Sequence, residues 1–314
     1  MKNEIRIGTR GSALAVYQAE LVKNKIERDF RAVTIDLVRI KTGGDMIRRQ
    51  RLSPFQTKRV FTREIEEALL KGEIDLAVHS AKDMSVNLPE GLRMGAVLER
   101  EDARDCLVSK DGRLLADLPA GARIGTSSPR RKAQVLRKRP DLVIREIHGN
   151  VDTRIRKLHA NDLEGMILAV AGLKRLGLMT YIAEIFPEEE MLPSPGQGAI
   201  VVEVRDKDDS LSELLRPIHH GPSGIRLACE RAFLRTLGGG CQLPCGVMTR
   251  VEGDRLSVKG MVLGLNGEVQ ADGEAEGLLG DAEVLGKRAA EKVLEQGGHE
   301  ILERVRHETE KKEK

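Results

Sequence analysis

The chain is poor in aromatic residues: of its 314 residues, 2% are Phe, Tyr or Trp, and none is Trp. Proteins that bind single-stranded nucleic acid usually stack its bases on aromatic side chains set between basic residues. The composition therefore argues against a nucleic-acid partner. It leaves the binding of phosphates or carboxylates open.

Membrane and secretion signals are also missing. No apolar run approaches the length of a membrane span, and the first four residues show no basic-then-apolar signal segment. The four cysteines are Cys106, Cys229, Cys241 and Cys245. We expect free thiols in a cytoplasmic protein with no membrane partner. A zinc site is not expected, because no second Cys/His pair accompanies Cys241 and Cys245.

Common catalytic and nucleotide motifs do not occur. The sequence contains neither a Walker A motif nor Gly-x-Gly-x-x-Gly, and no Ser-His-Asp arrangement can be picked out. The net charge is only +3, but residues 123–157 hold eleven Arg or Lys against three acids. This local excess of positive charge indicates an acidic ligand or partner.

A short repeat suggests two related domains. Arg123-Ile124-Gly125-Thr126 repeats Arg6-Ile7-Gly8-Thr9, and residues 168–174 echo residues 76–82 in the same order. Strands alternate with helices in both halves, which predicts parallel sheets whose ligands bind at the carboxyl ends of strands. From about His219 onward, a helix is followed by alternating segments and turns that predict a small antiparallel sheet.

Basic and hydroxyl side chains gather at the predicted strand ends. Thr126-Ser127-Ser128 opens a helix that continues with Arg130-Arg131, and hydroxyls, unpaired helix N–H groups and guanidinium groups together make an anion site. The candidates with the same chemistry are Arg10, Ser12, Asn150 and Arg154. A capped helix with solvated arginines is the alternative.

The segment His79-Ser80-Ala81-Lys82-Asp83 offers charge of the opposite sign. A carboxylate beside an ammonium group at a strand end can stay ionised, stabilise a cation and transfer a proton. A surface ion pair between Lys82 and Asp83 is the alternative.

Cys241 follows Gly238-Gly239-Gly240, so its neighbours on that side carry no Cβ and a flat substituent could approach the sulfur. The alternative is that the glycines end the preceding helix and the thiol packs as a small apolar group.

Seven segments together resemble the porphobilinogen deaminase family, also called hydroxymethylbilane synthase, and they stand in family order across nearly the whole chain. They are residues 7–12, 77–83, 125–131, 149–154, 168–176, 195–199 and 239–242. The resemblance implies an α/β protein with two periplasmic-binding-protein-like, doubly wound domains and a small α+β C-terminal domain with a three-stranded antiparallel sheet. The implied boundaries are 1–98 with 199–216, then 104–192, then 220–314.

The resemblance also implies the chemistry. A dipyrromethane cofactor, self-assembled from substrate, is attached to Cys241 through a thioether. Four porphobilinogens are then joined head to tail with loss of ammonia, and hydrolysis frees hydroxymethylbilane in tetrapyrrole (heme) biosynthesis. Asp83 is the implied catalytic residue of a transferase that acts as a monomer.

The implied ligand contacts are divided between the cofactor and the substrate. The cofactor would be bound by Ser80, Lys82, Asp83, Thr126, Ser127, Ser128, Arg130, Arg131, His148 and Asn150. The substrate would be bound by Arg10, Ser12, Lys58, Arg154, Ala169 and Gln197.

The sequence departs from the family pattern at several positions, and Ser85, Ala103 and Cys245 are the smaller changes. His148 stands where the family usually has Arg, and the 52–61 segment lacks expected glycines and one lysine while keeping Lys58. The alternative for the whole chain is a non-catalytic binding module for a small molecule with several carboxylates.

Overall fold

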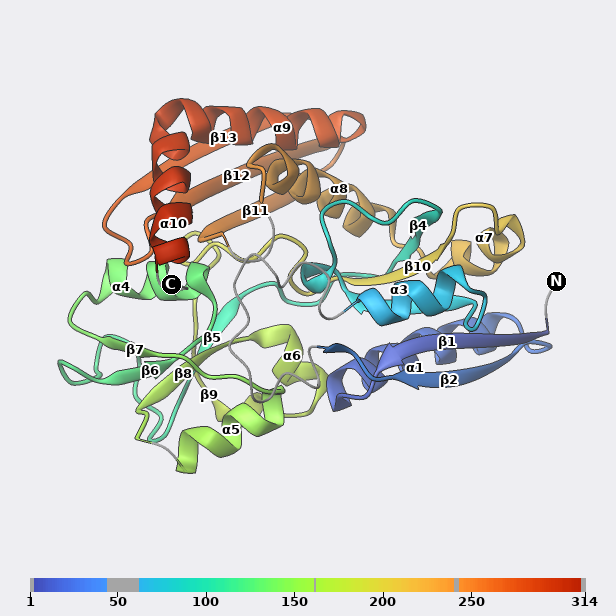
Figure 1. Ribbon diagram of the computed structural model, residues 1–314, viewed down its shortest axis with the longest axis horizontal. Coiled ribbons are helices and arrows are strands. Elements are labelled where there is room, and N and C mark those ends of the chain that lie inside the picture. The colour runs from blue at the N-terminus through green and yellow to red at the C-terminus, as the bar shows by residue number, and fades with distance from the viewer. Residues whose placement is uncertain (1–2, 44–61, 161, 240–242, 312–314) are drawn as a thin grey trace. The chain divides into compact units, whose positions relative to one another are not determined.

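A computed structural model describes residues 3–43, 62–160, 162–239 and 243–311. The chain forms two compact units (Figure 1). The first comprises Met1–Glu101 and Gly198–Ile225, and the second comprises Asp102–Gln197 and Arg226–Lys314. Each unit is described by itself below.

The first unit contains a five-stranded sheet in the order β2-β1-β3-β10-β4. Strand β1 runs parallel to β2 and β3, whereas β10 runs antiparallel to β3 and β4. The strands are β1 (Glu4–Arg10), β2 (Thr34–Ile40), β3 (Leu76–Ser80), β4 (Leu92–Val97) and β10 (Ile200–Arg205); the helices are α1 (Ala13–Asp29), α3 (Arg63–Leu70), α7 (Asp209–Leu215) and the short turns η1 (Ala81–Asp83) and η3 (Arg216–Ile218).

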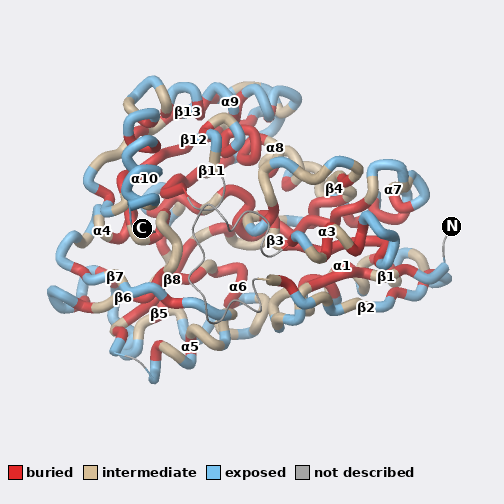
Figure 2. Tube along the Cα trace, viewed as in Figure 1, coloured by how far each residue is buried: buried red, intermediate tan, exposed pale blue. Residues whose placement is uncertain are grey.

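Both faces of this sheet are covered. Successive side chains of β3 point to opposite faces, and Leu76 to His79 are all buried, so each face must pack against other elements. Leu76 and Val78 belong to the buried cluster that includes Val22 and Ile26 of α1. Ala77 points to the other face and joins a second buried cluster with Ile65 of α3. In Figure 2 the central strands of this sheet are mostly buried, whereas the edge strand β2 and the outer helix faces are largely exposed or intermediate. Helices on both faces make this a doubly wound sheet.

The second unit contains a five-stranded sheet with the corresponding order β7-β6-β8-β5-β9. Strand β6 runs parallel to β7 and β8, whereas β5 runs antiparallel to β8 and β9. The strands are β5 (Asp105–Ser109), β6 (Arg123–Gly125), β7 (Val143–Arg145), β8 (Gly165–Ala169) and β9 (Ile182–Ile185); the helices are α4 (Pro129–Lys138), α5 (Val151–Ala160), α6 (Val170–Arg175) and the turn η2 (Met179–Tyr181).

This sheet is also packed on both faces. Met166 and Leu168 of β8 lie in one cluster with Leu158 of α5, and Ile167 lies in another with Val135 of α4. The predicted fold class, with two related doubly wound sheets, is therefore confirmed by the strand order and the packing.

Two details of the prediction are wrong. The sheets are mixed rather than parallel. Strand β10, which follows the return of the chain to the first unit, runs antiparallel to β3 and β4, and β5, the first strand of the second unit, runs antiparallel to β8 and β9. The second echo is also shifted: Ile7 pairs with Leu76, and its counterpart Ile124 pairs with Gly165. Leu76 thus corresponds to Gly165 rather than to Leu168. The similar residues at 76–82 and 168–174 suggested matching strands, but Val170 already begins helix α6, so most of the second segment is helical.

The predicted antiparallel sheet of three strands is confirmed, in the order β11-β12-β13. Gly260 and Gly273 face each other across β12 and β13. A Cβ at Gly260 would lie 2.2 Å from Phe233 of α8, and one at Gly273 would lie 2.2 Å from the carbonyl oxygen of Ala289 of α9, so both helices pack closely on one face. The elements are β11 (Cys245–Glu252), β12 (Arg255–Leu263), β13 (Gln270–Leu278), α8 (Gly221–Thr236), α9 (Ala282–Val293), α10 (His299–Lys311) and the turns η4 (Leu279–Asp281) and η5 (Leu294–Gly298).

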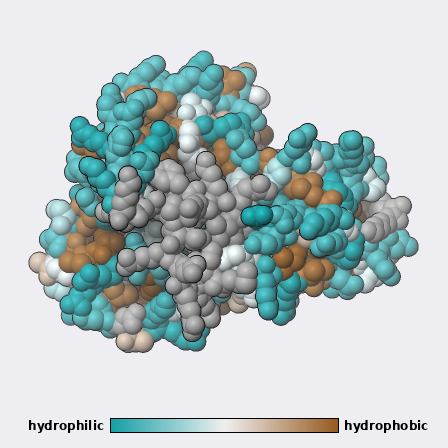
Figure 3. All heavy atoms as spheres, viewed as in Figure 1, coloured by the Kyte–Doolittle hydropathy of each residue, from teal (hydrophilic) through white to brown (hydrophobic). Residues whose placement is uncertain are grey.

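In the part of the chain that the structure describes, no helix combines the length and apolar character needed to cross a bilayer. Figure 3 shows a mostly hydrophilic face with separate apolar patches. The three domain boundaries inferred from the sequence stay a prediction.

Candidate active site

The loop after β6 and the start of α4 form one group of predicted site residues. Thr126 is buried, and its hydroxyl accepts a hydrogen bond from the Ser128 N–H at 3.2 Å. Ser128 caps α4, since its hydroxyl accepts a hydrogen bond from the Arg131 N–H at 3.4 Å and Pro129 occupies the first turn. The predicted N-cap is therefore present, and it places Arg130 and Arg131 in the first turn of the helix.

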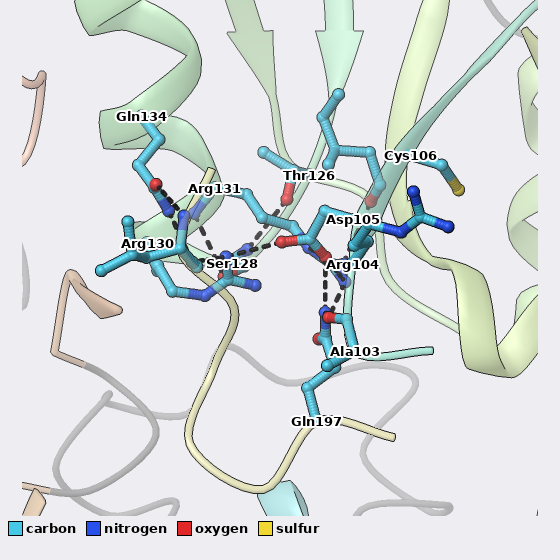
Figure 4. A network of polar contacts seen from close by, with 12 residues as sticks. Ala103, Arg104, Asp105, Cys106, Thr126, Ser128, Arg130, Arg131, Gln134 and Gln197 are labelled. Atoms are coloured by element: carbon cyan, nitrogen blue, oxygen red, sulfur yellow. Dashed lines mark hydrogen bonds and ion pairs between the residues drawn. The ribbon is translucent and has the colours of Figure 1, made fainter. Parts of the chain in front are cut away.

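Both arginines point inward and share one carboxylate (Figure 4). Arg130 and Arg131 are 3% and 6% exposed, and Asp105 at the start of β5 is fully buried. Arg130 Nη1 donates to Asp105 Oδ2 at 2.6 Å. Arg131 donates to Asp105 Oδ1 through Nε at 2.9 Å and through Nη2 at 2.7 Å. The guanidinium groups are therefore held in place, not solvated.

The two positive charges control the titration of Asp105. Burial alone would raise the pKa of this carboxyl, but the charges of Arg130 and Arg131 and the hydrogen bonds from Arg130 and Gln197 hold it well below its usual range. Burial lowers the pKa of Arg130, against the attraction of Asp105. One carboxylate for two guanidinium groups leaves this buried cluster with a net positive charge.

Gln197 lies against the same carboxylate. Its Nε2 donates to Asp105 Oδ1 at 2.9 Å and to the Ala103 carbonyl oxygen at 2.7 Å. On the other side of the arginines, Leu192 accepts hydrogen bonds at its carbonyl oxygen from Arg130 Nη1 at 2.7 Å and from Gln134 Nε2 at 3.0 Å. The network thus joins α4, β5 and residues 192–197.

The end of β7 and the start of α5 bring further predicted residues into the second unit. Ser127 donates its hydroxyl to the Ile147 carbonyl oxygen at 2.8 Å, which ties this segment to the β6 loop. His148 is exposed, with its Nδ1 at 3.5 Å from Ser127 Oγ. Gly149 has φ of +121°, a value that favours glycine, and its carbonyl oxygen accepts a hydrogen bond from Arg154 Nε at 2.8 Å.

Asn150 and Ala169 complete the predicted residues in this unit. Asn150 directly precedes α5 and is half-buried, and its carbonyl oxygen accepts a hydrogen bond from the Arg154 N–H at 2.9 Å. Ala169 ends β8, the strand next to β6. These loops all follow strand ends, as predicted.

The first unit carries a second group at the ends of β1 and β3. Arg10 ends β1, and Ser12 caps α1 by accepting a hydrogen bond from the Ala15 N–H at 3.3 Å. Ser80 ends the neighbouring strand β3, and Asp83 lies exposed in the turn that follows it, next to the half-buried Lys82.

Two predicted residues, Lys58 and Cys241, lie outside the described residues. The structure brings the other predicted residues together only within each unit. The first unit offers an exposed acid, a lysine and an arginine, and the second offers arginines and hydroxyls that favour anions. Taken by itself, the group in the second unit suits the carboxylates or phosphates of a ligand.

Sequence reasoning missed three buried polar contacts. Asp105 starts an otherwise apolar strand, Asp105-Cys106-Leu107-Val108, and a lone acid there was the signal that could have revealed it. Gln18 is buried on α1, and its amide lies 2.9 Å from Ser80 Oγ. His79 Nε2 lies 3.2 Å from Glu203 Oε2, with both side chains buried.

Two family models match the sequence. The model described as "Porphobilinogen deaminase, dipyromethane cofactor binding domain" matches residues 5–213, and "Porphobilinogen deaminase, C-terminal domain" matches residues 225–295. The first description confirms the predicted dipyrromethane cofactor.

Curated relatives agree over nearly the full length. Proteins named porphobilinogen deaminase from Pelotomaculum thermopropionicum, Thermus thermophilus and Syntrophomonas wolfei are each 46% identical to this chain. The matches cover 98%, 96% and 96% of this chain and 99%, 98% and 98% of the relatives.

Among solved structures, a TRAP periplasmic solute binding protein from Ralstonia eutropha H16 is 12% identical, with a TM-score of 0.42, and the match covers 74% of this chain and 80% of that one. This score is too low to add to the fold assignment, which rests on strand order and packing. The family matches do identify the chain, in agreement with its motifs and with the placement of their described residues at strand ends: it belongs to the porphobilinogen deaminase family.

Proposed function

We propose that this chain is a transferase that condenses four molecules of porphobilinogen head to tail, releases ammonia at each condensation, and hydrolyses the product to hydroxymethylbilane. The observation that carries the proposal is the placement of the family motifs on strand-end loops of both five-stranded sheets. There they provide an exposed acid in the first unit and buried arginines in the second.

The residues of the second unit fit a cofactor with acetate and propionate groups. Asp105 compensates only one of the two buried guanidinium charges, so a ligand carboxylate near Arg130 and Arg131 would meet a positive field. Cys241 would hold dipyrromethane through a thioether, with polar contacts from Thr126, Ser127, Ser128, His148 and Asn150. When bound, this group supplies the primer to which substrate units are added.

Asp83 is the residue we assign to catalysis. Its exposed carboxylate can approach the cation that remains when porphobilinogen loses ammonia, stabilise that charge, and accept a proton from the pyrrole nitrogen. Lys82 and Ser80 lie beside it and would orient the ligand. Gln18 would act indirectly, since its amide fixes the Ser80 hydroxyl.

The remaining assigned residues would bind substrate carboxylates or close the site around them. They are Arg10, Ser12, Lys58, Arg154, Ala169 and Gln197. A cytoplasmic monomer completes the proposal, and light scattering of the purified protein tests its oligomeric state. The family matches do not favour the alternative of a non-catalytic binding module.

Intact-protein mass spectrometry combined with an assay of porphobilinogen consumption tests the function. The parent should carry an adduct the size of two linked pyrroles and consume porphobilinogen. Cys241→Ser should lack both, whereas Cys245→Ser, which removes a buried thiol four residues away, should keep the adduct. An active parent with an unmodified Cys241 would exclude the thioether, and no consumption by adduct-bearing protein would exclude the reaction.

A further inference from the structure

We propose that Asp105 is a positioning residue: it fixes the directions of Arg130 and Arg131 and ties them to two of the three segments through which the chain passes between its compact units. The proposal rests on the proposed function, because that function assigns the two arginines to ligand binding. It adds a residue that acts through them.

The first step is the geometry at the carboxylate. Both oxygens of Asp105 are used, Oδ2 by Arg130 and Oδ1 by Arg131 and Gln197, with donor distances of 2.6 to 2.9 Å. Arg130 also donates to the Leu192 carbonyl oxygen at 2.7 Å, and Arg131 also donates to the Ile167 carbonyl oxygen at 3.1 Å. With so many fixed contacts, neither guanidinium can rotate without breaking charge-assisted hydrogen bonds.

The second step is the position of the arginines on α4. Positive side chains in the first turn of a helix face the positive end of its dipole, which is unfavourable. Burial adds a desolvation cost, because both arginines are nearly inaccessible. A buried carboxylate at this point offsets both costs. Without Asp105, neither cost would be offset, and the arginine side chains would move away from the buried positions that Figure 4 shows.

The third step is the connection to the chain crossings. The chain leaves the first unit after Glu101, returns to it after Gln197 and leaves it again after Ile225. The network contains residues from the first two of these crossings. Gln197 donates to the Ala103 carbonyl oxygen on the outgoing segment and to Asp105, and its Oε1 accepts from Arg131 Nη2 at 3.4 Å. One amide thus joins the outgoing segment, the returning segment and the arginines. A change in the arginines is therefore coupled to both crossings, and the coupling is reciprocal.

Two possible roles for Asp105 predict opposite changes in ligand binding when the carboxylate is removed. If Asp105 only competed with ligand for the arginines, its removal would free them and strengthen ligand binding. If it positions them, removal weakens productive binding even though the net positive charge rises. The fraction of protein that carries the dipyrromethane adduct separates the two roles, because the proposed function assigns Arg130 and Arg131 to the cofactor.

The experiment compares Asp105→Asn and Gln197→Met with the parent and with Asp141→Asn. Asp141 is a matched control, because it binds Arg139 through two hydrogen bonds of 2.8 and 2.7 Å at the other end of α4 and is exposed. The measurements are kcat and KM for porphobilinogen, the adduct fraction by intact mass, the unfolding temperature, and hydrogen exchange of residues 101–105 and 195–198.

For Asp105→Asn we expect the adduct fraction to fall about tenfold or more, as loss of the charge-assisted hydrogen bonds that position the cofactor-binding arginines implies. Gln197→Met keeps both ion pairs, so KM should rise about threefold, and exchange in both crossing segments should be faster. Asp141→Asn should stay within about twofold of the parent in adduct fraction and in KM.

An unchanged or higher adduct fraction in folded Asp105→Asn would overturn the positioning role. If Asp105→Asn does not fold, Gln197→Met provides the test. Parent-like KM and parent-like hydrogen exchange in Gln197→Met would overturn the coupling between the arginines and the crossing segments. A parent that lacks the adduct and turnover would instead refute the proposed function, and the exchange rates would still test the link.

Discussion

The two five-stranded sheets share a strand order but carry charge in different places. After β1 the arginine, Arg10, precedes the helix cap Ser12, whereas after β6 the arginines follow the cap Ser128 and lie in the helix. After β3 the chain continues into a turn with Lys82 and Asp83; after the corresponding strand β8 it enters α6 with apolar residues.

The two sheets also differ in where their buried carboxylates, Asp105 and Glu203, lie relative to the strand-end loops. By strand pairing, Asp105 of β5 corresponds to Ile200 of β10, since these residues oppose the strand-end residues Ala169 and Ser80. Glu203 lies three residues further from that edge and meets one imidazole rather than two guanidinium groups. The first sheet thus has the acid that we propose to be catalytic, Asp83, in solvent, and its buried acid, Glu203, away from the strand-end loops. The second places its buried acid at those loops, where it controls the arginines.

Asp83→Asn is the strongest test of this division. We expect porphobilinogen consumption to fall by about a hundredfold or more, because the variant cannot accept a proton or stabilise a cation as a carboxylate does. The unfolding temperature should stay close to that of the parent, since the side chain is exposed. Steady-state assays and thermal unfolding measure the two effects.

Asp36→Asn is its control, as Asp36 is an exposed aspartate on β2 of the same sheet. It should retain parent-like turnover. Near-normal turnover in Asp83→Asn would remove the acid from the mechanism and end the functional contrast between the sheets.

His79→Leu tests whether Glu203 depends on a single partner. The substitution leaves a fully buried carboxylate without its imidazole, which should lower the free energy of unfolding by about 3 kcal/mol. His299→Leu removes an imidazole 3.6 Å from Glu303 in an exposed pair and should cost less than about 0.5 kcal/mol. Equal losses in urea unfolding would contradict the distinction between buried and exposed pairs.

Gly267→Ala probes how α4, which carries the arginines of the second unit, is held by the β12–β13 hairpin. Gly267 has φ of +76°, and an added Cβ would lie 2.2 Å from the carbonyl oxygen of Ala133 on α4. Strain and overpacking should together lower the free energy of unfolding by about 2 kcal/mol or more.

Gly112→Ala is the matched control, because φ is +78° there and nothing lies within 4 Å of the added Cβ. It should cost about 1 kcal/mol from backbone strain alone. If both variants lose the same stability in urea, the contact of the hairpin with α4 does not constrain the helix.

The sequence predicted whatever depended on local pattern. The repeated Arg-Ile-Gly-Thr located β1 and β6, the cap Ser128 located α4, and turn residues located the C-terminal sheet. It could not predict that β5 and β10 insert antiparallel, because their partners come from distant parts of the chain. For the same reason Arg130 and Arg131 suggested a ligand site, while the partner they bind, Asp105, went unnoticed.

Acid titration distinguishes Asp105 from the acids in solvent. Its folded-state pKa is lowered, so the stability it contributes is complete above the unfolded-state value and is lost as pH falls towards the folded-state value. The stability gap between the parent and Asp105→Asn should therefore shrink by about 1 kcal/mol between pH 5 and pH 3. Urea unfolding at each pH measures the gap. A constant gap would mean that Asp105 titrates alike in the folded and unfolded states.

His148→Arg carries the smallest expected effect and concerns a departure from the family pattern at the arginine-rich site. Residue 148 is exposed beside Ser127, and a guanidinium there can bind a carboxylate through two parallel hydrogen bonds, which an imidazole cannot do. At one fixed pH, kcat/KM should be about threefold higher in His148→Arg than in the parent. His307→Arg, which changes an exposed histidine on α10, should leave kcat/KM unchanged. Equal kcat/KM values for the parent and His148→Arg would show that a guanidinium at residue 148 does not contribute to ligand binding, and the contribution of the second sheet would then come from its other basic residues.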